Sequence, residues 1–215
     1  MTLGFVSPLV VSYFAYGSNM HPAIFEGVRA VVPVTAQPAV VRDHRLAFNL
    51  LGGAAEPAFA GIEPAPGAVC HGVLYELTAA DFARVCATEG VPLAYAPLRV
   101  RVEAGAGAAP RGRPAWTLRA AAGPMRARAE RDEPTPSERY VAILRDGAYT
   151  SGLPDDWCRR LDALAGARAD EPADARARAA SARAAAARLS PPVARWQARE
   201  AGLARRRAYA RSARF

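Results

Sequence analysis

The run VVSYFAYGSNM at residues 10–20 joins β-branched and aromatic residues to a glycine and two short polar residues. This composition predicts a buried strand that enters a tight turn at Gly17. Ser18 and Asn19 offer capping oxygens, and Pro22 suits the first turn of a helix over about residues 21–27. The segment therefore predicts a strand, a glycine-containing loop and a helix start.

The loop after this strand is a candidate binding site. Gly17 lets the backbone come close to a ligand, and unpaired N–H groups before a helix can hold a carboxylate or an oxyanion. The alternative is an ordinary strand-to-helix turn in which Ser and Asn act only as caps. The candidate binding residues of this loop are Tyr16, Gly17, Ser18, Asn19 and Met20.

The remaining pattern predicts strands first and helices later. Strands are expected at 31–41 and 45–50, with Asp43 and His44 as the turn between them, and at 69–77, 95–103 and 116–121; segments 52–57 and 105–112 are loops. Helices are expected at 79–88, 138–146 and 155–165. This order favours an α+β domain with a mostly antiparallel, closed sheet.

The helix at 79–88 ends beside a second candidate residue, Glu89. Thr78 caps the start of this helix, and Gly90 ends it. A carboxylate at the C-terminal end of a helix meets the unfavourable end of the helix dipole, which suits a group that both takes and gives a proton. The alternative is a surface glutamate at a helix end, which is common.

The positive charge of the chain lies in its C-terminal part. The formal net charge is +8 and lysine is absent; residues 1–166 hold 16 Arg and 16 acidic residues, whereas residues 167–215 hold 12 Arg and 4. The neutral body gives no reason to expect a nucleic-acid partner, and any weak polyanion contact would fall on the tail. The tail is rich in Ala and Arg and has few large apolar residues, so it is expected to form no core.

Other classes of site have little support in the sequence. No apolar run reaches the roughly 18 residues of a membrane span, and no basic start marks a signal peptide, so a cytoplasmic protein without a membrane partner is expected. The odd, scattered cysteines argue against disulfides and against a zinc site, and the histidines lack metal-ligand spacing. No phosphate-binding or dinucleotide fingerprint is present, so no cofactor or metal is implied.

Together, the YFAYGSN motif and the Glu-Gly pair some seventy residues later resemble the γ-glutamylcyclotransferase family, also described as AIG2-like. The likeness covers about residues 13–164 and continues in the intervening and following segments: 41–49 (VRDHRLAFN), 61–62 (GI), 66–67 (PG), 71–75 (HGVLY), 136–140 (PSERY) and 151–154 (SGLP). The segment 116–128 aligns poorly, and Met20 stands where Leu is usual.

The resemblance implies a small mixed β-barrel flanked by helices, with Glu89 as the catalytic residue. It also implies a pocket formed by the Tyr16–Met20 loop and Tyr140, and release of 5-oxoproline from a small γ-glutamyl substrate. Two alternatives stay open: a non-catalytic binding module of this fold, and a related cyclotransferase that acts on γ-glutamylamines or glutathione. The expected organisation is a lead-in at 1–12, a catalytic domain at 13–166 and a basic tail at 167–215, and a homodimer is compatible with it.

Overall fold

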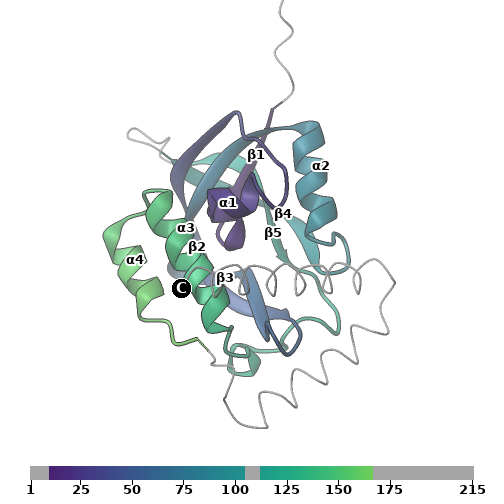
Figure 1. Ribbon diagram of the computed structural model, residues 1–215, viewed down its shortest axis with the longest axis vertical. Coiled ribbons are helices and arrows are strands. Elements are labelled where there is room, and N and C mark those ends of the chain that lie inside the picture. The colour runs from purple at the N-terminus through teal and green to yellow at the C-terminus, as the bar shows by residue number, and fades with distance from the viewer. Residues whose placement is uncertain (1–9, 105–111, 167–215) are drawn as a thin grey trace, which may run out of the picture.

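Five strands close into a barrel in the computed structural model, which describes residues 10–104 and 112–166 (Figure 1). The strand order around the barrel is β1-β3-β2-β4-β5. All neighbouring pairs are antiparallel except β1 and β5, which are parallel and meet at Tyr13 and Trp116. The strands are β1 Val10–Ala15, β2 Thr35–Leu51, β3 Ala58–Thr78, β4 Tyr95–Ala104 and β5 Arg113–Ala120. The predicted α+β fold with a mixed, mostly antiparallel barrel is confirmed.

Helices cover the barrel on separate sides. In Figure 1, α2 lies on one side, whereas α3 and α4 pack together on the other and α1 lies in front of the strands. The helical segments are η1 Ser18–Met20, α1 Pro22–Phe25, α2 Ala79–Thr88, η2 Glu130–Asp132, α3 Glu138–Thr150 and α4 Asp155–Asp162. The expected helix at 79–88 has the predicted bounds, whereas the first helix is a single turn and α3 runs four residues further than predicted.

The expected turn at Asp43 and His44 is wrong. These residues lie inside the continuous strand β2, at a register shift where Asp43 has a φ of 55°. The Asp43 carboxylate accepts a hydrogen bond of 2.8 Å from the N–H of Gly67 on β3. A bulge that twists two long strands thus carries the same local signals as a hairpin turn.

A second register shift between β2 and β3 lies next to the candidate site. Ala47 pairs with Gly61 and Leu50 pairs with Phe59, so two residues of β2 lie opposite Ala60 alone. A bulge of this kind leaves backbone groups outside the ladder, and buried backbone groups need other partners. The N–H and the carbonyl of Ala60 find them in two tyrosine side chains, described below.

The core lies inside the barrel and beneath the helices. Phe25 of α1 is fully buried and stacks on Tyr75 of β3, with ring centroids 4.3 Å apart. This contact anchors the single helical turn to the barrel, because a four-residue helix has little stability of its own. Within the described ranges, no helix is both long and apolar enough to cross a membrane. The predicted basic tail lies outside the described residues.

Candidate functional site

Glu89 lies directly after α2, at its C-terminal cap. The Thr78 side chain accepts a hydrogen bond of 3.1 Å from Asp81 N–H at the start of the helix. Gly90 has a φ of 71°, a conformation that glycine adopts without strain, and this ends the helix. These two local signals fix the length of α2 and so place Glu89 at its end. The Glu89 side chain points inward and is only 9% exposed.

One oxygen of the Glu89 carboxylate is held by two donors. Oε1 accepts a hydrogen bond of 2.7 Å from Asn19 Nδ2 and lies 2.6 Å from Arg29 Nη2. Among the described residues, Oε2 has no hydrogen-bond partner. The carboxylate is therefore fixed in orientation through one oxygen.

The predicted loop lies against this carboxylate. The sequence suggested Asn19 as a helix cap, but in the structure it does not cap a helix. Its Nδ2 instead donates to Glu89 and to the Tyr13 hydroxyl, which is 3.2 Å away. Its backbone carbonyl accepts a hydrogen bond of 3.0 Å from Tyr75. The cap of α1 is instead His21, whose Nδ1 accepts from Ala23 N–H. The side chain of Asn19 is free to bridge because that cap comes from His21.

The backbone of the loop forms a short 3₁₀ turn. The N–H of Met20 donates to the Gly17 carbonyl at 2.9 Å, and its side chain is buried in the core. The N–H groups of Ser18 and Asn19 have no hydrogen-bond acceptor among the described residues. Two of the predicted backbone donors are thus open, and the one from Met20 is used within the loop.

Gly17 is needed for a close approach rather than for a special backbone conformation. Its φ is −111°, outside the left-handed region. A Cβ at this position would lie 3.1 Å from the Cβ of Ala60 and 3.4 Å from the Tyr140 hydroxyl. A side chain would therefore push the loop away from β3 and from the tyrosine next to it.

Two buried tyrosines bind the backbone of Ala60, and a third, Tyr16, lies in the loop before it. The Tyr140 hydroxyl accepts a hydrogen bond of 3.1 Å from Ala60 N–H, and Tyr95 donates one of 2.7 Å to the Ala60 carbonyl. The Tyr140 hydroxyl also lies close to Gly17, so the loop packs against α3. The Tyr16 hydroxyl donates to the Leu118 carbonyl of the neighbouring strand β5. The bulge opposite Ala60 thus connects the loop, α3 and β4.

Burial keeps these phenols protonated. It raises the pKa of Tyr140 to about 12 and holds the pKa values of Tyr16 and Tyr95 well above their usual range. Burial and the nearby Glu89 carboxylate also raise the pKa of Tyr13. At neutral pH these groups therefore act as hydrogen-bonding hydroxyls that shape the site.

The structure brings together most of the predicted residues and adds others that the sequence did not reveal. Asn19 touches Glu89, and Tyr140 lies next to Gly17 and Ser18, whereas the Met20 side chain belongs to the core. Arg29 and Tyr95 were not predicted. A lone arginine between apolar neighbours was the one signal for Arg29, and Tyr95 carried only the alternation of a strand.

Comparisons with known proteins agree with this fold. Residues 69–161 match the AIG2-like family. The chain is 27% identical over 167 residues to "Gamma-glutamyl cyclotransferase aclK" of Aspergillus oryzae and 30% identical over 149 residues to "Gamma-glutamyl cyclotransferase gliK" of Claviceps purpurea. In sequence and in fold, this chain resembles the γ-glutamyl cyclotransferases. The resemblance predicted from the motifs is confirmed.

The extent of these likenesses is partial. The alignments cover 71% and 66% of this chain, and the chain spans only 60% and 64% of the length of these two cyclotransferases. A solved structure described as "Gamma-glutamyl cyclotransferase" has a TM-score of 0.62 at 20% identity, covering 80% of this chain and 99% of that one. YkqA from Bacillus subtilis has a TM-score of 0.56 at 26% identity, covering 74% of this chain and 56% of that one.

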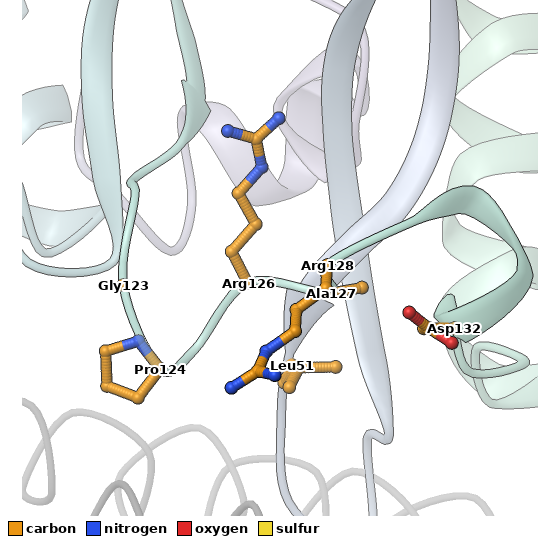
Figure 2. Close-up of a pocket in the computed structure, with 7 residues that line it drawn as sticks. All are labelled: Leu51, Gly123, Pro124, Arg126, Ala127, Arg128 and Asp132. Carbon is orange, nitrogen blue, oxygen red and sulfur yellow. The ribbon is translucent and has the colours of Figure 1, made fainter.

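This cyclotransferase-like fold also has a hollow of about 540 Å³ away from the predicted residues (Figure 2). None of the predicted site residues lines it. Figure 2 shows Arg126 and Arg128 pointing in opposite directions from the segment after β5, and Arg126 pairs with Glu63 at 2.6 Å. Among the described residues, no group of three or more His, Cys, Asp or Glu could hold a metal ion. The lining of the hollow is Leu51, Gly123, Pro124, Arg126, Ala127, Arg128 and Asp132.

Proposed function

We propose that this protein is a γ-glutamylcyclotransferase in which Glu89 carries the proton. The observation that supports this most directly is the free Oε2 of a buried carboxylate whose Oε1 is held by Asn19 and Arg29. A carboxylate fixed through one oxygen can exchange a proton through the other without losing its orientation. The γ-glutamyl cyclotransferase names of the two curated relatives support the same reaction class.

The proposed reaction needs no external nucleophile. Glu89 takes a proton from the substrate α-ammonium group, and the neutral amine attacks the γ-carbonyl carbon. A C–N bond closes a five-membered ring, and the carbonyl electron pair moves to oxygen. When this pair returns, the bond from the γ-carbon to the leaving nitrogen breaks, and Glu89 returns the proton to that nitrogen. The ring nitrogen then gives its second proton to the Glu89 carboxylate, which passes it to the released amine, so that a neutral lactam and an ammonium group remain. The products are 5-oxoproline and a free amino acid or amine, with no water consumed.

The loop supplies the complementary electrostatics. The open N–H groups of Ser18 and Asn19 are assigned to the γ-glutamyl group and to the developing oxyanion. One such donor contributes roughly 3 kcal/mol to transition-state stabilisation. Intramolecular attack already has a large proximity advantage, so the enzyme has mainly to fold the substrate and move protons.

Buried aromatic side chains form the wall of the proposed pocket. The Tyr16 and Tyr140 hydroxyls are hydrogen-bonded to backbone groups, so each ring has a fixed position in the proposed pocket. Residues 13–166 form the proposed catalytic unit, with residues 167–215 as an appendage. No residue of this proposal needs a metal or a cofactor.

The test is a product assay on the full chain. Release of 5-oxoproline is measured with γ-glutamyl dipeptides, glutathione and γ-glutamyl-lysine, with Glu89→Gln as the matched inactive variant. Turnover of at least one substrate by the wild type, and its loss in Glu89→Gln, is the expected result. Binding of γ-glutamyl compounds without any product would instead point to a binding module of the same fold.

A further inference from the structure

Arg29 is a buried cation next to the candidate site. It lies in the turn after α1, where its N–H donates to the Ile24 carbonyl at 3.0 Å, and the residue is 7% exposed. The next residue, Ala30, has a φ of 54°, which is uncommon for a residue other than glycine. The Ala30 carbonyl is held by Arg84 of α2 at 2.9 Å. This unusual turn is therefore tied to the same helix that carries Glu89.

Each nitrogen of the Arg29 guanidinium has an acceptor in the protein. Nη2 lies 2.6 Å from Glu89 Oε1, Nε donates to Asn19 Oδ1, and Nη1 donates to the Thr88 carbonyl at 3.3 Å. These acceptors come from the loop at 17–20 and from the last turn of α2. With an acceptor on each nitrogen and its side chain buried, Arg29 faces residues of the site itself.

The geometry explains why an arginine is required. The carbonyls at the end of α2 and the Glu89 carboxylate are all negative, so their proximity is unfavourable without a cation. A planar guanidinium can reach a carboxylate, an amide oxygen and a helix carbonyl at once, whereas an ammonium cannot match this fork. The amide of Asn19 is also oriented by it: Nδ2 faces Glu89 because Oδ1 faces Arg29.

We propose that Arg29 is a positioning residue that fixes Glu89 through Oε1 and orients Asn19, so that Oε2 is the oxygen that exchanges the proton. This inference rests on the proposed cyclotransferase function. Arg29 would act only through Glu89 and Asn19, without contact to the substrate. Its loss should therefore lower kcat while leaving KM nearly unchanged.

The test compares Arg29→Ala and Arg29→Lys with the wild type in the full chain, using the γ-glutamyl substrate that the wild type turns over best. Misplacement of a catalytic group by about 1 Å can cost about 100-fold in rate. We expect a loss of kcat of this order for Arg29→Ala, a loss of at least about tenfold for Arg29→Lys, and a KM within about threefold of the wild type. Guanidinium ions should partly restore kcat of Arg29→Ala, whereas NaCl at equal ionic strength should not.

Arg45→Ala is the matched control, because Arg45 is also largely buried among carboxylates, at Glu63 and Glu133. It should lower the melting temperature without a comparable loss of kcat. An Arg29→Ala variant with kcat within twofold of the wild type, a raised KM at unchanged kcat, or an equal loss in Arg45→Ala would overturn the proposal.

Two further results keep the test decisive. If Arg29→Ala does not fold, Arg29→Lys retains the charge and carries the test through its kcat alone; wild-type kcat in that variant would count against the proposal. Absence of 5-oxoproline from the wild type would contradict the proposed function itself, whereas an active wild type with an unchanged kcat in Arg29→Lys would contradict only the role of Arg29.

Discussion

Two clusters of this barrel contain the same residue types, a glutamate with arginine and asparagine partners, but differ in how many carboxylate oxygens are paired. Glu89 is held by Arg29 and Asn19, whereas Glu63 is held by Arg126, Arg45 and Asn49. In the Glu63 cluster both carboxylate oxygens are paired: Oε1 with Arg126 and Asn49, each at 2.6 Å, and Oε2 with Arg45 at 2.8 Å. In the Glu89 cluster one oxygen has two partners and the other has none among the described residues.

The comparison shows that residue types alone do not make a candidate site. Glu63 lies where its side chain is 20% exposed and two cations neutralise it, so it has no oxygen left for a substrate. Glu89 is more buried and, among the described residues, has a single cationic partner and one oxygen without a partner. The Glu63 cluster is saturated and fits a structural role, whereas the unsaturated Glu89 cluster fits the proposed proton transfer.

The largest expected difference between the clusters is in turnover. Glu89→Gln should lower kcat by about 100- to 10,000-fold, because the amide cannot accept the α-ammonium proton. Substrate binding, followed by calorimetry, should persist through the loop contacts. Glu63→Gln is the matched control and should retain kcat within about twofold. More than about a tenth of wild-type rate in Glu89→Gln would show that Glu89 is not the essential base.

Substitution of the asparagine in each cluster, Asn19 or Asn49, should give a smaller effect than substitution of the glutamate. Asn19→Ala removes one charge-assisted donor from Glu89, and such bonds contribute about 1.5–3 kcal/mol, so kcat should fall about 10- to 100-fold. Asn49→Ala removes the corresponding donor from Glu63 and should act on stability instead. The measurement pairs steady-state kinetics with thermal unfolding for both variants. Equal kinetic effects in the two variants would remove the distinction between the clusters.

Acid should reveal the structural role of Glu63. Burial opposes ionisation, but the hydrogen bonds from Arg126 and Asn49 and the nearby charge of Arg45 outweigh it and lower the pKa of Glu63 below its usual 4.5. The unfolded chain then binds the proton more readily, so this contribution to stability is present above about pH 4.5 and is lost as pH falls below it. Its loss in Glu63→Gln should cost about 1 kcal/mol, or about 2–4 °C in melting temperature.

Measuring the melting temperatures across pH tests the direction of the Glu63 contribution to stability. The gap in melting temperature between wild type and Glu63→Gln should be widest near pH 7 and should narrow below about pH 4.5, where the wild-type carboxylate is also protonated. A gap that widens in acid would contradict the assignment of Glu63 as an ionised structural group.

The smallest effect is expected from truncation. Both clusters lie within residues 10–166, and the composition of residues 167–215 gives them few large apolar side chains. Truncation after Ala167 should therefore change the melting temperature by only about a few degrees, with kcat unchanged. Aggregation of the shortened chain would show that the tail contributes to folding.

Local signals were reliable where they act over a few residues. Thr78 and Gly90 set the ends of α2, and the alternation of Val100 and Val102 marked the half-buried strand β4. The same kind of signal misled at Asp43, because a bulge in a long strand and a hairpin turn both favour short polar residues. The bulge opposite Ala60 left no signal in the local sequence, because the hydrogen-bond partners of the Ala60 backbone are Tyr95 and Tyr140 from distant segments.

The sequence by itself determined the α+β class, the loop at 16–20, the end of α2 and the candidacy of Glu89, because capping, glycine conformation and hydrophobic periodicity depend on near neighbours. Only the tertiary structure decided that Asn19 faces Glu89 rather than capping a helix, and that Arg29 joins them. Pairing of β1 with β3, the strand before α2, brings β1 and its following loop against the end of α2, some seventy residues later in the chain. The partner of a buried charge is set by which residues are close in the folded structure, so the spacing of residues along the chain does not predict it.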